Sequence, residues 1–288
     1  MTIPYPRRLT LPFALACTMG LCPSAFAADP AAQGSTHDAP DSPPESPPGS
    51  PPEPAPVARS WAYVDETSVP RAGETFLQLR GNYSHYSASP TRPFATNLAT
   101  PGSTAEVGAE AGLGAHTSLA ATVMGGDGFS PSARSNMGAT LGIRYAPELS
   151  TPGLRVAFSA AYLRETTSAN GVFLRASTTY DAGAWRFGAT GVAEKVFARG
   201  RDEADVMVVL GVQREVLPQL RVGIEYVGQD LEGLIDDEEA EGGARHFLGG
   251  TLSYAFLDER FSFIAGPSAG LSGGAPTLLG RAGIVARF

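Results

Sequence analysis

The chain has 288 residues, a formal net charge of −8, 34 Gly and 24 Pro, and a mean hydropathy of −0.05. Beyond its N-terminal region it has no apolar run of the ~18 residues that a transmembrane helix needs, which excludes a helical membrane protein. The acidic balance argues against nucleic acid as a partner.

The N-terminal region has the three parts of a secretory signal peptide. Arg7 and Arg8 precede an apolar run over residues 9–21, and the small-residue cleavage pattern Ala25-Phe26-Ala27 follows. We therefore predict a signal peptide over residues 1–27 and an exported protein. Both cysteines of the chain lie in this segment, so the mature chain has none.

A proline-rich segment comes next. Ten prolines fall within residues 28–57, where large apolar residues are almost absent. Such a segment cannot bury enough surface to fold, so we predict a disordered periplasmic linker over residues 28–74. Two roles remain open for this arm: it is a spacer, or it binds a partner in the periplasm or the cell wall.

From Thr75 to Phe288 the sequence alternates with a period of two residues. Apolar residues such as Leu154, Val156 and Phe158 alternate with polar or small ones, which is typical of a strand with one apolar face. Twelve such runs are predicted, at 75–86, 103–114, 117–126, 135–145, 154–165, 171–181, 184–197, 203–215, 218–230, 244–256, 259–269 and 277–288.

The connections between these runs alternate in length, from the short Ala182-Gly183 to the long stretch 231–243. Short turns on one side and long loops on the other are typical of a transmembrane β-barrel. The fold class predicted is therefore all-β, a transmembrane antiparallel up-and-down barrel of about 12 strands over residues 75–288, preceded by the disordered arm. A soluble β-sandwich, which would show the same alternation, is the alternative.

The last strand ends in Ile284-Val285-Ala286-Arg287-Phe288. A terminal Phe preceded by alternating apolar residues resembles the C-terminal signal of the Gram-negative outer-membrane β-barrels, and no specific family follows from it. The resemblance implies a location in the outer membrane of a Gram-negative bacterium. It also implies that the barrel-assembly machinery recognises this strand.

Outward-facing aromatic residues mark both ends of the strands. Tyr145, Tyr180 and Trp185 fall at the periplasmic ends, and Tyr83 and Tyr162 fall on the far side. Because amphipathic rings prefer the membrane interfaces, we predict two aromatic girdles. The exterior is then in contact with outer-membrane lipids and lipopolysaccharide.

The polar faces of the strands are predicted to line the lumen, and several of their arginines map to the periplasmic ends. Such a basic belt is either a constriction that attracts small anions or a set of cross-strand ion pairs that fill a narrow barrel. The residues predicted to line a pore are Arg80, Glu106, Glu110, Arg144, Arg155, Arg175, Arg186, Glu194, Arg221, Glu225, Arg281 and Arg287.

We expect no enzyme and no catalytic, cofactor or metal site. His116 and Ser118 have the spacing of a His-x-Ser pair found in some outer-membrane lipid hydrolases, but the Asn-Gly that follows the serine there is replaced by Leu119-Ala120. The acidic loop 230–241 lacks the spacing of a calcium loop.

The predicted function is a narrow pore for passive passage of small hydrophilic or anionic solutes. One alternative is a closed structural barrel that acts as an anchor, with the arm binding a periplasmic partner. A lipid-modifying enzyme is the other alternative.

Overall fold

The computed structural model describes residues 60–85, 102–126, 137–165, 169–197, 204–229, 231, 244–272, 275 and 277–288. These residues belong to one compact unit, Pro54–Phe288. The predicted signal peptide, the linker up to residue 59 and the acidic loop apart from Leu231 lie outside the described residues. Among the described residues, there is no helix long and apolar enough to cross a membrane.

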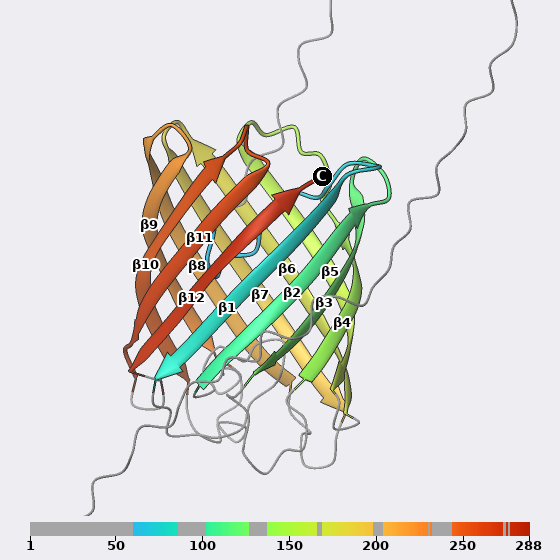
Figure 1. The fold of residues 1–288 in the computed structure, drawn as a ribbon, viewed down its shortest axis with the longest axis vertical. Coiled ribbons are helices and arrows are strands. Elements are labelled where there is room, and N and C mark those ends of the chain that lie inside the picture. The colour runs from blue at the N-terminus through green and yellow to red at the C-terminus, as the bar shows by residue number, and fades with distance from the viewer. Residues whose placement is uncertain are drawn as a thin grey trace, which may run out of the picture. The chain divides into compact units, whose positions relative to one another are not determined.

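Twelve antiparallel strands form a closed barrel (Figure 1). Each strand pairs with its neighbours in the sequence, and the first strand pairs with the last to close the ring. The strands are β1 (Thr75–His85), β2 (Gly102–Gly112), β3 (Thr117–Gly126), β4 (Met137–Tyr145), β5 (Leu154–Glu165), β6 (Asn170–Ala182), β7 (Trp185–Phe197), β8 (Ala204–Leu217), β9 (Leu220–Gln229), β10 (Arg245–Phe256), β11 (Phe261–Gly270) and β12 (Leu278–Arg287). Every strand begins and ends within two residues of the predicted position. The closed antiparallel barrel of twelve strands confirms the predicted fold class.

Short turns join the strands at the rim that carries the C-terminus, which is the upper rim in Figure 1. β6 and β7 are joined by two residues, of which Gly183 has a φ of 60°. β8 and β9 are also joined by two residues, and Gln219 there has a φ of 69°. Two-residue hairpin turns require such positive φ values. In outer-membrane barrels the rim with the short turns faces the periplasm, and we name it the periplasmic rim.

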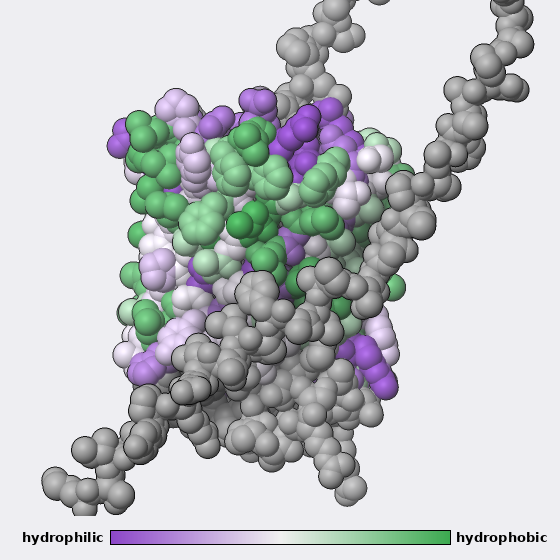
Figure 2. Space-filling view, viewed as in Figure 1, coloured by the Kyte–Doolittle hydropathy of each residue, from purple (hydrophilic) through white to green (hydrophobic). Residues whose placement is uncertain are grey.

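The outer face of the barrel is apolar. Large side chains such as Leu79, Ile143 and Phe158 are more than half exposed on it. Figure 2 shows hydrophobic residues across one side of the wall and hydrophilic residues gathered at the periplasmic rim. A surface of this kind is stable against lipid and costly against water. The predicted contact with lipid therefore fits the barrel wall.

Twelve strands enclose a wide interior, and yet most side chains on the inward faces of the strands are buried from solvent. An eight-stranded barrel has an interior that its own side chains fill, and a larger barrel leaves space. In this barrel, residues that precede β1 fill part of that space. Trp61, Ala62, Tyr63 and Val64 pack with inward-facing apolar side chains of the wall into one core.

Candidate functional site: the lumen and its N-terminal segment

Residues 60–74, here named the lumenal segment, precede β1 and run from the barrel interior to the periplasmic rim, where Ala72 and Gly73 are exposed. Trp61, Ala62, Tyr63 and Val64 are each at most 5% exposed. Thr67 bonds Thr179 near the end of β6, and Ala72 forms a bridge with Gly112 at the end of β2. The disordered linker predicted over residues 28–74 is therefore corrected for residues 60–74. The burial of large apolar side chains and a set of polar contacts hold this part of it in place.

Residues 61–64 are here named the tip of the lumenal segment. Glu225 on β9 holds the backbone of this tip through hydrogen bonds. The carboxylate accepts hydrogen bonds from the N–H groups of Ala62 at 2.9 Å, Tyr63 at 2.7 Å and Val64 at 2.8 Å. Successive backbone N–H groups that converge in this way form an anion-binding concavity. Glu225 is 1% exposed, so the segment supplies the donors that this buried carboxylate needs.

Two glycines of the wall make room for the indole of Trp61. Gly188 on β7 and Gly211 on β8 are directly paired across the strands. A Cβ atom at Gly188 would lie 2.9 Å from Trp61 Cζ2, and one at Gly211 would lie 2.6 Å from Trp61 Cζ3. Any larger residue at these positions therefore conflicts with the observed place of the ring.

Polar contacts fix Ser60 beside this slot. The Arg186 guanidinium donates to Ser60 Oγ at 2.9 Å, and Gln213 Nε2 donates to the Ser60 carbonyl oxygen at 2.7 Å. Both wall residues are at most 1% exposed. The segment therefore accepts hydrogen bonds from two buried donors of the wall, which favours its docked position.

Tyr63 lies on the opposite side of the tip. Its hydroxyl donates to the Gly266 carbonyl oxygen on β11 at 2.6 Å. The Arg281 guanidinium from β12 lies 5.5 Å from the centre of the Tyr63 ring and donates to the Ala62 carbonyl oxygen at 3.0 Å. Burial raises the pKa of the Tyr63 phenol to about 12, so the side chain is neutral at physiological pH.

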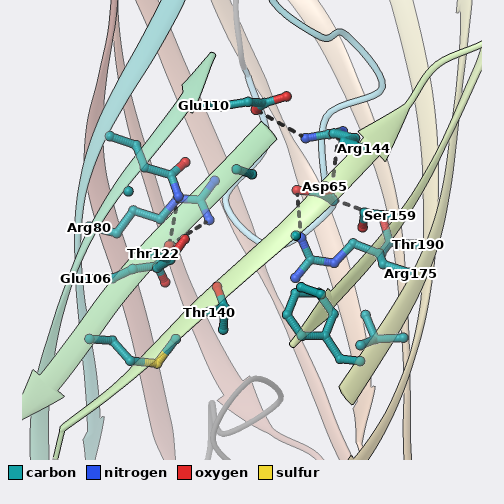
Figure 3. A pocket seen from close by; sticks show the side chains of 18 of the residues that line it. Asp65, Arg80, Glu106, Glu110, Thr122, Thr140, Arg144, Ser159, Arg175 and Thr190 are labelled. Carbon is teal, nitrogen blue, oxygen red and sulfur yellow. Dashed lines mark hydrogen bonds and ion pairs between the residues drawn. The ribbon is translucent and has the colours of Figure 1, made fainter. Parts of the chain in front are cut away.

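Asp65 joins the segment to two arginines on the other wall (Figure 3). Its carboxylate lies 3.1 Å from Arg144 Nη2 on β4 and 3.2 Å from Arg175 Nη1 on β6. Arg144 Nη1 also lies 3.7 Å from Glu110 Oε2 on β2. The Asp65 N–H donates to Thr190 Oγ1 on β7 at 2.9 Å. One carboxylate of the segment is thus shared between two guanidinium groups.

A cavity of about 120 Å³ lies beside the segment, mainly against the inner wall of β1 to β7, with Met207 of β8 and Arg281 of β12 also lining it. Within it, Arg80 Nη1 lies 3.5 Å from Glu106 Oε1, and Gln78 Nε2 donates to the same oxygen at 2.8 Å. The charged side chains that line it are four arginines and three carboxylates, namely Arg80, Arg144, Arg175, Arg281, Asp65, Glu106 and Glu110. The lining is therefore strongly charged with a small positive excess.

Comparison with known proteins agrees with this architecture. No protein-family model matches the chain, and no curated protein matches it. Among solved structures, the chain is similar to the KdgM porin, with a TM-score of 0.50 and 9% identity over 74% of this chain and 99% of that one. It is also similar to an outer-membrane channel from Pseudomonas putida F1, with a TM-score of 0.52 and 11% identity over 78% of this chain and 98% of that one. At such identities the likeness concerns the fold. The chain shares the barrel fold of these two channels.

The apolar exterior of the barrel fits the predicted location in the outer membrane of a Gram-negative bacterium. The outward-facing aromatic residues fit the same placement. Tyr145, Tyr180 and Trp185 are 45–48% exposed near the periplasmic rim, and Tyr83 and Tyr162 are 47% and 50% exposed toward the other ends of their strands. Two aromatic girdles of this kind flank the apolar band of outer-membrane barrels.

At the periplasmic rim of the barrel, arginines of the predicted belt are paired with carboxylates. Asp181 Oδ2 lies 2.6 Å from Arg155 Nη2, and Asp181 Oδ1 lies 2.7 Å from Arg186 Nε. Arg221 Nη2 lies 2.6 Å from Glu215 Oε2. These contacts match the predicted alternative of cross-strand ion pairs at this rim.

The twelve residues predicted to line a pore fall into four groups by their surroundings. The first group lines the cavity and consists of Arg80, Glu106, Glu110, Arg144, Arg175 and Arg281. The second group, Arg186 and Glu225, forms hydrogen bonds with residues 60–64 of the lumenal segment. The third group pairs with carboxylates at the rim and consists of Arg155, Arg221 and Arg287, the last with Glu74 at 3.7 Å, and the fourth is Glu194 on β7, which is 1% exposed. The first group faces the cavity, whereas the side chains of Arg155, Arg221 and Arg287 are 20–31% exposed at the rim.

The His116-x-Ser118 spacing has a structural explanation. The Ser118 side chain is fully buried, and its hydroxyl donates to Glu110 Oε1 at 2.6 Å. It thus forms part of the polar network beside Arg144. Among the described residues, no group of three or more His, Cys, Asp or Glu could hold a metal ion.

The residues that sequence reasoning missed are those of the lumenal segment, above all Trp61, Tyr63 and Asp65. One signal could have drawn attention to them. Trp61 and Tyr63 are the first Phe, Trp or Tyr residues after the predicted signal peptide. Aromatic residues at the end of a proline-rich linker indicate that this part of the linker buries surface.

Proposed function

We propose that the protein is a narrow pore for passive passage of small hydrophilic or anionic solutes. The path would run through the cavity along β1 to β7, and the lumenal segment would set its width. The observation that carries the proposal is the one-sided filling of the lumen. The tip of the segment packs on β7, β8, β9 and β11, while a charged cavity is left along the other wall.

The charge of the cavity supports a preference for anions. Its lining has one arginine more than carboxylates, and charged side chains at a constriction determine which ions pass. Arg80 is 15% exposed at its side chain, so its charge acts on the solution in the cavity rather than only on its partner.

Planar bilayer recordings test this proposal. The full chain should give small, stable single-channel currents with a mild anion preference, and deletion of residues 60–66 should raise the conductance severalfold. Arg80→Glu should shift the reversal potential toward cations. Arg214→Glu is the matched control, because Arg214 contacts the outward-facing Trp185 ring, 5.5 Å from its centre, and should leave the preference unchanged.

A closed structural barrel is the second candidate, and the burial of Trp61 to Val64 in the lumen favours it. A closed barrel that anchors the arm would insert into the bilayer without current. Silent insertion of both the full chain and the 60–66 deletion, each folded by heat-modifiable mobility, would refute the pore and support the anchor.

We further propose three partners on the basis of the sequence. Outer-membrane lipids and lipopolysaccharide would contact the apolar exterior, and the barrel-assembly machinery would recognise the C-terminal strand that ends in Phe288. The proline-rich arm would bind a partner in the periplasm or the cell wall. Pull-down with a peptide of residues 28–57 from periplasmic and cell-wall fractions, compared with a scrambled peptide, tests the third.

A further inference from the structure

The contact between Asp65 and the arginines of β4 and β6 has the form of a ligand in a binding site. The carboxylate belongs to the lumenal segment, and both guanidinium groups belong to the barrel wall, at 3.1 and 3.2 Å. Arg144 is 5% exposed. The wall thus presents two buried or half-buried cations to a carboxylate that is not part of the wall.

The two arginines have donors in reserve. Within the described residues, Nε of Arg144 and Nε of Arg175 are buried and donate no hydrogen bond. Arginine recognises carboxylates best through two parallel N–H donors. Asp65, placed by the backbone of the segment, uses only part of this capacity.

Space for a free ligand adjoins these groups. Asp65, Arg144 and Arg175 all line the cavity of about 120 Å³. At ~10–15 Å³ for each water site, the cavity has room for about eight to twelve waters, or a small organic acid. The Phe173 ring, 5.2 Å from the Arg175 guanidinium carbon, gives one side of the site an apolar surface.

We propose that Arg144 and Arg175 form a binding site for the carboxylate of a small organic acid, and that Asp65 occupies this site as a tethered competitor. The inference deepens the proposed function, on which it rests for the access of solute to the lumen. A solute carboxylate that replaces Asp65 leaves the charge around the two arginines unchanged. Arg144 also keeps Glu110 at 3.7 Å throughout.

Tethering makes the competition strong. A group held on a short chain acts at an effective concentration in the millimolar range, so the full chain should bind a free carboxylate weakly. Weak binding is what a pore needs, because a solute that binds tightly does not leave. Release of Asp65 also removes one of the contacts that hold the segment, which couples solute binding to the width of the path.

Isothermal titration calorimetry on the detergent-solubilised full chain tests the proposal, with succinate as the probe and succinamide as the uncharged control of similar shape. Asp65→Asn keeps the size of the side chain and its backbone bond to Thr190, but it removes the competing charge. This variant should bind succinate at least tenfold more tightly than the unmodified chain. Neither protein should bind succinamide.

The arginines are tested in the Asp65→Asn background. Arg175→Gln should abolish succinate binding, and Arg144→Gln should do the same. Arg155→Gln is the matched control, since Arg155 pairs with Asp181 at the rim and lies outside the cavity. Because Arg144 is buried and its replacement endangers folding, the half-buried Arg175 decides the outcome if Arg144→Gln loses heat-modifiable mobility.

Two results would overturn the proposal: Asp65→Asn binds succinate no better than the unmodified chain, or binding in the Asp65→Asn background survives Arg175→Gln. Bilayer currents on the same preparations separate this outcome from failure of the proposed function. A chain that conducts but gains no succinate binding refutes the carboxylate site alone. A chain that binds succinate but carries no current refutes the pore and leaves the site standing.

Discussion

Replacement of Glu225 by Ala should release the tip of the lumenal segment. The carboxylate accepts three backbone N–H groups at 2.7–2.9 Å, and each hydrogen bond to a charged acceptor contributes about 1.5–3 kcal/mol. Water that enters the vacated volume would restore part of this hydrogen-bond free energy, so we expect docking of the segment to weaken by about 3–6 kcal/mol. A change of 1.4 kcal/mol is tenfold in an equilibrium, so the undocked population should rise at least a hundredfold.

Trp61 provides the measurement. The chain has two tryptophans, of which Trp61 is 1% exposed and Trp185 is 45% exposed on the outer face. In a Trp185→Phe background, emission therefore reports on the segment alone. Glu225→Ala should shift the emission maximum to the red and raise quenching by acrylamide. Glu225→Gln, which keeps one acceptor oxygen, should give an intermediate change.

A second lumenal carboxylate serves as the control. Glu106 bonds Gln78 and Arg80 of the wall, so Glu106→Ala should leave Trp61 emission unchanged. If Glu225→Ala left the emission and the quenching of Trp61 as they were, the three N–H bonds would not be what holds the segment. The reasoning from Glu225 would then be refuted.

Three further outcomes are expected. Gly211→Ala should expel the Trp61 ring and shift its emission to the red, because the new Cβ would lie 2.6 Å from the ring. Gly191→Ala is the control, because open space surrounds that position, and it should leave the emission unchanged. Equal emission of the two variants would show that Gly211 does not make room for the indole. Docking of the lumenal segment should weaken as the pH rises from about 10 to about 12, by up to about 1.4 kcal/mol per pH unit. The reason is that the undocked Tyr63 phenol ionises near its ordinary pKa, whereas the pKa of the docked phenol is about 12. Tyr63→Phe should remove this step from a pH titration of Trp61 emission. Asp181→Asn should destabilise the barrel by about 3 kcal/mol, since it removes the negative charge beside the buried Arg186 guanidinium. An unchanged midpoint of unfolding in guanidinium chloride would show that the charge of Asp181 adds nothing.

The strands could be predicted because their signal is local. A wall between lipid and lumen requires alternation along each strand, and the run Leu154–Leu163 shows it without reference to any other part of the chain. The same alternation assigns residues such as Arg80 and Glu225 to the inward face. It does not identify their partners, because those depend on what fills the interior.

The lumenal segment could not be placed from the sequence, for two physical reasons. Glu225 binds N–H groups of the backbone, and every residue except proline has one, so no side chain at residues 62–64 signals the contact. The slot for Trp61 depends on Gly188 and Gly211, which meet only through the register between β7 and β8. The charged cavity could not be predicted for the same reason, because one of its lining residues, Asp65, lies in the stretch that the sequence predicts as linker.

The origin of the segment's partners has a consequence for the order of assembly. The bonds from the tip reach Glu225, Gly266 and Arg281, at sequence separations of 161–219 residues. Contacts at such separations form after local ones, and these depend on β9, β11 and β12, the last third of the barrel. We therefore expect the segment to dock only after these late strands are in place. In the closed barrel β1 pairs with β12, and Thr75 and Phe288 exchange backbone hydrogen bonds at 2.9 and 3.0 Å. A barrel that lacked these strands would leave Trp61 exposed to water, so we expect burial of Trp61 to report closure of the barrel.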